Sequence, residues 1–124
     1  MASKNALGHI ADATAIAVWG GVVARRLVGQ RSMFAVVELE PNTAVPEHRH
    51  PHEQLGLVLT GGGRFRVGHE VMDVSPGSTW NIPPDIPHEF TVGPEGAVVI
   101  DVFTPNREDW EGLPQAQDRP PRWP

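Results

Sequence analysis

The sequence predicts an all-β domain, a sandwich or a barrel of the jelly-roll type. Three observations favour this class. The apolar runs are short, turns rich in glycine and proline separate them at even spacing, and no stretch has the periodicity of a helix. A chain of 124 residues with 40% hydrophobic and 20% charged residues is long enough for one core, so a second domain is not expected.

The first two expected strands lie on either side of a short polar turn. Residues 22–28 form an apolar run after Gly20-Gly21, and residues 33–40 alternate so that one face is apolar. The members of that apolar face are Met33, Ala35, Val37 and Leu39. Pro41-Asn42 is expected to end the second strand.

The remaining expected strands follow in chain order as residues 54–60, 64–67, 70–74, 78–82, 89–92 and 97–103. We expect a hairpin that turns at residues 68–69, between the segments 64–67 and 70–74. The glycines at 61–63 and the segment 93–96 are expected to separate successive strands.

Three parts of the chain differ in composition. Residues 1–18 are Ala-rich and polar and are expected to be an arm, either a frayed end or a segment that docks on a neighbour. Residues 19–104 hold the strands of the barrel. Residues 105–124 are expected to be a proline-rich tail without regular structure.

Charge and composition exclude several classes of function. The net charge of -5 with no block of Lys and Arg predicts no nucleic-acid partner and no membrane partner. No span of about 20 apolar residues is present, and residues 11–18 are too short for a signal peptide, so we expect a cytoplasmic protein. Cysteine and tyrosine are absent, which leaves metal ions, carboxylates, His, Arg and hydroxyls for catalysis.

Candidate metal ligands lie in two segments of the chain. If residues 48–50 form a strand, His48 and His50 point to the same side. Gln54 begins the next strand and offers an amide oxygen, and His88 follows a proline-stiffened turn. Three histidines and one glutamine predict a metal site, whereas a lone His-x-His is more often a polar strand face.

The combined spacing of these residues with Gly61, Gly77 and Pro83 resembles the two motifs of the cupin superfamily, which implies a double-stranded β-helix, or jelly-roll, barrel. The sequence departs from the cupin pattern at Gln54, where most cupins have glutamate, and at Asp85 and Val92. The ligand set would then carry no negative charge. Such a centre favours an anionic ligand.

Asp101 is a carboxylate inside the apolar strand 97–103, where it shares a face with Val99 and Phe103. A buried carboxylate is costly unless it is paired or functional. Two interpretations are therefore open: a functional group, or an ion pair with Arg107 that anchors the tail.

A closer resemblance rests on three motifs together. They are His-x-His-Pro-His-Glu-Gln at 48–54, Ile-Pro-Pro-Asp-Ile-Pro-His at 82–88, and Asp-Val-Phe-Thr-Pro-x-Arg-Glu-Asp at 101–109. They resemble the small cupins of pectin and alginate catabolism that linearise 4,5-unsaturated monouronates. The resemblance implies the metal ligands His48, His50, Gln54 and His88, and the catalytic pocket residues Asp101, Phe103 and Arg107.

The resemblance predicts a metal-dependent isomerase or lyase-type enzyme acting on a small anionic sugar acid. It would open the ring of the unsaturated uronate to the linear 5-keto-4-deoxyuronate. One divalent transition metal is expected, Zn, Ni, Fe, Mn or Co. The alternatives are another cupin enzyme, a metal dioxygenase or a polyketide-type cyclase, and a non-catalytic module that binds a metal or a sugar acid.

The strand 54–60 predicts a partner surface. One face carries Leu55, Leu57 and Leu59, and a small barrel has little interior for both faces of a strand. We expect an N-terminal strand or a second subunit to cover these leucines, and hence a homodimer. On the other face Gly56 either leaves volume for substrate or allows the strand to curve.

Overall fold

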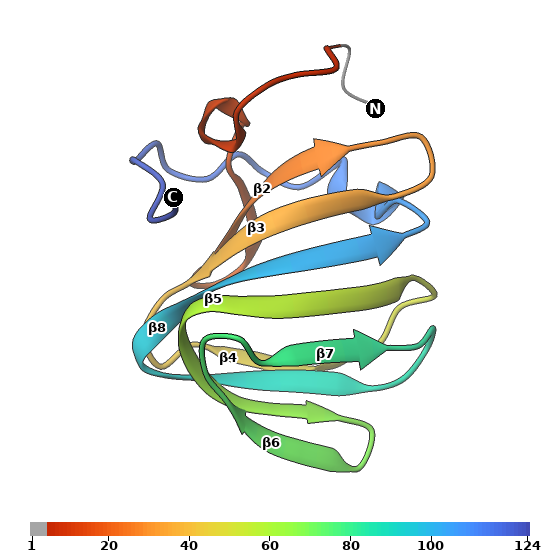
Figure 1. Cartoon of the computed structure of the whole chain (residues 1–124), viewed down its shortest axis with the longest axis vertical. Helices are drawn as coiled ribbons and strands as arrows, with labels where there is room; N and C mark the ends of the chain where they lie inside the picture. Colours follow the sequence, from red (N-terminus) through yellow and green to blue (C-terminus); the bar gives the residue numbers. More distant parts are fainter. Residues whose placement is uncertain (1–4) are drawn as a thin grey trace.

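A computed structural model of the chain, which describes residues 5–124, is an almost entirely antiparallel β structure, so the predicted all-β class is confirmed (Figure 1). The strands are β1 (Ile16–Trp19), β2 (Val22–Val28), β3 (Met33–Leu39), β4 (Ala44–His48), β5 (Glu53–Val67), β6 (Glu70–Val74), β7 (Thr79–Ile82) and β8 (His88–Thr104). The two 3-10 turns are η1 (Ile10–Asp12) and η2 (Glu108–Trp110). No helix in the described part of the chain is long and apolar enough to cross a bilayer.

The strands form one curled sheet built on β5 and β8. The pairing order is β1-β2-β3-β8-β5-β6, and in addition β4 pairs with β8 and β7 pairs with β5. Figure 1 shows β8 bending so that its C-terminal half lies beside β3 while its N-terminal half lies in the lower part of the barrel. The jelly-roll barrel follows from these two long bent strands, each of which serves both halves of the fold.

Two predicted strand breaks are wrong. The glycines at 61–63 lie inside β5, and the segment 93–96 lies inside β8. At these points the ladder between β5 and β8 continues, with irregular register around Gly61. A Cβ on Gly61 would lie 2.0 Å from the carbonyl oxygen of Gly96, and both glycines have positive φ. Glycine is therefore needed there to let the two backbones bend against each other, not to end the strands.

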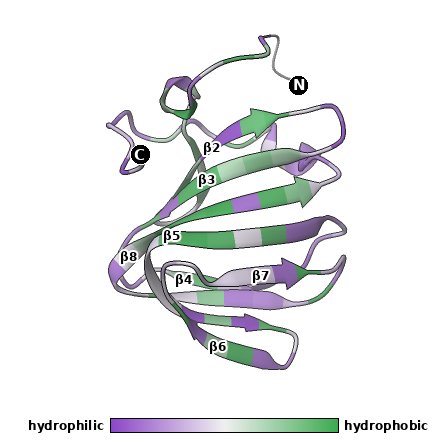
Figure 2. Cartoon of the chain, in the orientation of Figure 1, coloured by the Kyte–Doolittle hydropathy of each residue, from purple (hydrophilic) through white to green (hydrophobic). Residues whose placement is uncertain are grey.

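The core lies inside the curl of the sheet. The predicted apolar face of residues 33–40 is buried, and it packs with side chains from β5, β7 and β8 such as Val58, Ile82 and Phe103. Figure 2 shows hydrophobic residues along β3, β5 and the C-terminal half of β8, whereas hydrophilic residues lie in turns, at the two ends of the chain and along the N-terminal half of β8. Burial of this face stabilises the packing of the strands that carry the candidate site.

The prediction that an N-terminal strand covers the outer leucines is wrong. Strand β1 pairs with β2 instead, and Leu55 and Leu57 remain 42% and 37% exposed. Coverage by a second subunit, and hence the homodimer, stays a prediction.

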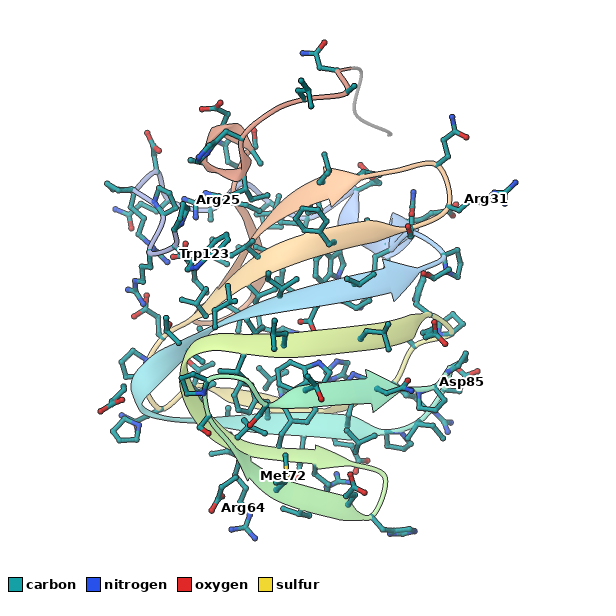
Figure 3. All side chains as sticks on the ribbon, in the orientation of Figure 1. Arg25, Arg31, Arg64, Met72, Asp85 and Trp123 are labelled. Carbon is teal, nitrogen blue, oxygen red and sulfur yellow. The ribbon has the colours of Figure 1, made fainter. Side chains whose placement is uncertain are left out.

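The chain beyond β8 returns along the barrel. Trp110 is buried, and Gln115 forms an isolated bridge with Ile16 of β1. Figure 3 shows Trp123 and Arg25 on the side where this segment passes β2 and β3. The expected boundary after residue 18 falls within β1, and β8 ends at Thr104 where the tail was expected to begin. The division into arm, barrel and tail stays a prediction.

Candidate metal centre

Cross-strand pairing brings the two histidine motifs together. His48 is the last residue of β4 and is the register partner of His88, the first residue of β8. The condition that residues 48–50 form one strand is not met, because β4 ends at His48 and His50 lies in the following loop. That loop is held by the Asp85 N–H, which donates to the carbonyl of His50 at 2.8 Å.

The three histidines form a compact cluster. One ring nitrogen from each of His48, His50 and His88 lies within 4.8 Å of the others. His50 and His88 are buried, and His48 is half-buried. This cluster is small enough for one metal ion to contact all three rings.

Backbone carbonyls fix the tautomer of each ring. The Nδ1 atoms lie within hydrogen-bond distance of carbonyl oxygens: His48 of Pro46 at 2.8 Å, His50 of His52 at 3.0 Å, and His88 of Ile86 at 2.9 Å. A carbonyl oxygen only accepts, so each Nδ1 carries the proton and each Nε2 presents a lone pair. The Nε2 of His88 is buried and has no hydrogen-bond partner among residues 5–124. This is the arrangement that metal-binding histidines require.

Burial keeps two of the rings neutral. It lowers the pKa of His50 to about 4, and the positive charge of Arg107 contributes to the decrease. Burial likewise lowers the pKa of His88 to about 4, with the neighbouring His48 and His50 adding to the effect. At neutral pH these rings are therefore uncharged and able to act as ligands.

Gln54 adds an oxygen to the cluster. Its Nε2 donates to Oδ1 of Asp101 at 2.9 Å, which turns its Oε1 toward the histidines, 3.0 Å from His50 Nε2. With the proton of His50 on Nδ1, two lone pairs face each other across this distance. A cation placed among these acceptors relieves that repulsion, so the donor set fits a divalent transition metal.

Asp101 lies beside the cluster and is buried. Its Oδ1 accepts from Gln54 and from the indole N–H of Trp80, each at 2.9 Å, while its Oδ2 accepts from none of the described residues. Burial raises the pKa of Asp101 to about 6, although these two hydrogen bonds and the charge of Arg107 oppose the increase. Asp101 therefore titrates much closer to neutrality than an ordinary carboxyl group.

Arg107 does not form the ion pair with Asp101 that the sequence left open. Its guanidinium pairs with Asp109 instead, through Nε at 3.0 Å and Nη2 at 2.8 Å. The guanidinium carbon also lies 5.0 Å from the ring centroids of both Phe103 and Trp110. This bracing holds the arginine at the wall of a cavity.

That cavity brings together nearly all of the predicted site residues. Its lining includes His48, Gln54, His88, Asp101, Phe103 and Arg107. His50 completes the histidine cluster, and its ring lies edge-on to Phe103 with the centroids 5.8 Å apart.

Comparison with known proteins identifies the family. A family model described as the cupin domain matches residues 35–103, more than half of the chain. The chain is a cupin. It resembles the small cupins that linearise unsaturated monouronates. A comparison with curated protein sequences finds no match.

Solved structures of other cupins superpose closely on this one. An RmlC-like cupin from Shewanella frigidimarina has a TM-score of 0.80 at 23% identity, over 88% of this chain and 98% of that one. KdgF from Halomonas sp. has a TM-score of 0.71 at 25% identity, over 77% and 88%. A variant of oxalate decarboxylase from Bacillus subtilis, an enzyme with Mn(II) centres, has a TM-score of 0.72 at 21% identity, over 82% and 30%. This cupin thus spans about a third of the decarboxylase chain.

Sequence reasoning missed one residue at the cupin cavity, Trp19, and one hydrogen bond there, from Trp80 to Asp101. Trp19 lines the cavity, with its ring centroid 5.3 Å from that of His48. Trp80 lines the cavity, packs in the core and donates its indole N–H to Asp101. No local pattern signals these contacts, because they depend on which strands become neighbours.

Proposed function

We propose that this cupin is a metal-dependent enzyme that opens the ring of a 4,5-unsaturated monouronate to the linear 5-keto-4-deoxyuronate. The observation that supports this proposal is the shared cavity, which places Asp101, Phe103 and Arg107 beside the histidine cluster. These three residues come from the motif that resembles uronate-linearising cupins. A small anionic substrate suits a site with neutral ligands and an arginine.

The metal would be held by Nε2 of His48, His50 and His88 and by Oε1 of Gln54. When bound, a divalent cation supplies Lewis-acid stabilisation for the carboxylate and for negative charge that develops on the ring oxygen. No step of the reaction needs an oxidant or a reductant, so a redox-inactive metal suffices.

Asp101 carries the proton in this proposal. Its carboxylate takes the proton from the anomeric hydroxyl, the bond between C1 and the ring oxygen breaks, and C1 becomes an aldehyde. The resulting C5 enolate becomes a ketone when Asp101 returns the proton to C4. The reaction is therefore an isomerisation in which one proton moves. A pKa of about 6 suits a group that must both accept and donate near neutral pH.

Arg107 and Phe103 hold the substrate. Asp109 uses the Nε and Nη2 atoms of Arg107, while Nη1 has no hydrogen-bond partner among the described residues. The Nη1 N–H groups are thus available for the substrate carboxylate. Phe103 is almost fully buried and provides an apolar wall against the sugar face.

The test is to incubate the metal-loaded protein with 4,5-unsaturated galacturonate and follow the loss of its enol-ether absorbance in the ultraviolet. The wild type should accelerate the decay, and both Asp101→Ala and His88→Ala should reduce that acceleration strongly. A wild type with confirmed metal content that matches the spontaneous rate would refute the uronate reaction. Oxygen uptake would then identify a dioxygenase, and binding of galacturonate without turnover would identify a binding module.

A further inference from the structure

Three residues on three adjacent strands form one row across the sheet. Gly56 of β5 is the register partner of Trp80 on β7 and of Asp101 on β8. Facing residues on neighbouring strands point to the same side of a sheet. A side chain at position 56 would therefore stand between Trp80 and Asp101.

The absent side chain at Gly56 lets the indole cross the row. A Cβ at this position would lie 1.9 Å from Trp80 Nε1, the atom that donates to Asp101 at 2.9 Å. The sequence left two interpretations of Gly56 open, volume for substrate or curvature of the strand. The space at Gly56 is instead filled by the Trp80 indole. The glycine leaves room for a hydrogen bond between residues two strands apart.

The donor at the end of this bond is rigidly held. Trp80 is buried and stacks on Phe65 at 13° with the ring centroids 4.3 Å apart. Its indole N–H donates to Asp101 Oδ1, the same oxygen that accepts from Gln54. The bond from Trp80 therefore fixes the position of Oδ1. Toward Gln54 this oxygen can only accept a hydrogen bond.

We propose that Asp101 is a positioning residue for the metal centre. Trp80 holds Asp101 across Gly56, and Asp101 in turn orients the side chain of residue 54, which explains why that residue is a glutamine. Asp101 directs the Gln54 Nε2 away from the histidines and Oε1 toward them. Asp101 is hydrogen-bonded to Gln54, so it also places beside this ligand the negative charge that a glutamate ligand would bring. This inference rests on the metal centre of the proposed function and adds a second role to that of Asp101.

The chemistry of position 54 separates this proposal from simple ligation. A carboxylate is ordinarily a better ligand for a divalent cation than a neutral amide, so Gln54→Glu would strengthen an independent site. Here the same substitution would instead place a carboxylate oxygen against Asp101 Oδ1, where Gln54 now donates. Two acceptors at hydrogen-bond distance repel each other, and the new ligand would turn away or hold a proton.

The test is a double-mutant cycle on metal affinity, with Zn²⁺ as the probe and a chromophoric chelator as competitor at pH 7.5. We expect Gln54→Glu to bind Zn²⁺ about 10- to 100-fold more weakly than the wild type, the usual effect of disturbing the groups behind a metal ligand. Adding Asp101→Asn to Gln54→Glu should restore at least about 10-fold, because it removes the negative charge at position 101 that repels the carboxylate introduced at position 54. A Gln54→Glu variant that binds Zn²⁺ as tightly as the wild type, or a double variant whose loss of affinity is the sum of the single effects, would overturn the proposal.

Two further variants test the row itself and keep the proposal open to refutation if Gln54→Glu does not fold. Trp80→Phe keeps the stack on Phe65 but removes the donor, and Gly56→Ala displaces the indole. Each should weaken Zn²⁺ binding by about 3-fold or more and should change the visible spectrum of the Co²⁺ form. Gly112→Ala is the matched control, because its Cβ would have no atom of the described residues within 4 Å. Unchanged affinity and spectrum in both variants would refute the role of the row.

The failure of this inference and the failure of the proposed function give different results. Coupled Zn²⁺ affinities in a protein that does not accelerate uronate ring opening would refute only the reaction. Turnover together with additive Zn²⁺ affinities would refute only the positioning role of Asp101.

Discussion

Two buried carboxylates, on neighbouring strands of the same sheet, have opposite surroundings. Glu38 on β3 is 1% exposed and Asp101 on β8 is 7% exposed. Register places Asp101 opposite Ala35, so Asp101 points into the barrel while Glu38 points to the other face. The difference between them lies in the partners that meet each carboxylate.

Glu38 is surrounded by cations. Arg25 Nη1 pairs with it at 2.8 Å, Arg119 pairs with its other oxygen, and the backbone N–H of Arg122 donates at 3.0 Å. Burial alone would raise the pKa of Glu38. The hydrogen bonds from Arg122 and Arg119 and the charges of Arg119 and Arg25 outweigh it and hold the pKa below its ordinary value. This carboxylate stays ionised and fastens the end of the chain to the barrel.

Within the described part of the chain, Asp101 has only neutral hydrogen-bond donors, Gln54 and Trp80, and its pKa is raised rather than lowered. Cationic partners keep a buried carboxylate ionised, and its ion pairs then stabilise the fold. Neutral donors fix the position of the group and leave its proton exchangeable. We therefore expect substitutions of Asp101 to affect turnover and substitutions of Glu38 to affect stability.

The largest expected effect is on turnover. Asp101→Asn should reduce the rate of uronate ring opening by about 10²- to 10⁴-fold, the usual contribution of a general acid or base, because an amide cannot carry the proton. The measurement is the initial rate in the ultraviolet assay at equal metal content. A variant that keeps more than about a tenth of the wild-type rate would show that another group moves the proton.

The next effect is on stability. Glu38→Gln should lower the free energy of unfolding by about 3–5 kcal/mol, because the buried Arg25 loses its counter-charge. Turnover per folded, metal-loaded molecule should not change, since Glu38 does not line the cavity. Urea unfolding measures the first quantity and the ultraviolet assay the second. Glu40→Gln is the control: that exposed pair with Arg122 should contribute less than about 1 kcal/mol.

Glu38 also predicts how stability depends on pH. A carboxyl group whose folded pKa lies below its ordinary value of 4.5 stabilises the fold fully above that value. The contribution is lost as the pH falls through the folded pKa. The stability difference between the wild type and Glu38→Gln should therefore be constant near neutrality and narrow below about pH 4.5. Urea unfolding from neutral pH down to about pH 3 checks this, and a difference that does not narrow would contradict the ionic role of Glu38.

The smallest effect concerns the end of the chain. Arg119→Ala should lower the free energy of unfolding by about 1 kcal/mol, because Glu38 keeps Arg25 and the side chain of Arg119 is 28% exposed. Arg31→Ala is the matched control, since Arg31 projects into solvent from the β2–β3 turn in Figure 3. An Arg119→Ala variant no less stable than Arg31→Ala would show that the side chain of Arg119 contributes nothing through Glu38.

Local patterns in the sequence were sufficient for the fold class and for the spacing of the candidate ligands. Alternation, turn residues and the absence of a helical period predicted an all-β chain, and the hairpin at residues 68–69 forms as expected. The motifs containing His48 and His88 predicted a histidine cluster. These features depend on residues a few positions apart, where backbone geometry links sequence directly to structure.

The partners of the two carboxylates were decided only by the tertiary structure. Glu38 meets Arg119, which is 81 positions away, and Asp101 meets Trp80 only because Gly56 lies between them in the sheet. The same limit explains why β5 and β8 run through glycines that were expected to end them. Cross-strand register joins residues that are distant in the chain, and it is set by burial of the whole sheet rather than by the residues beside each position.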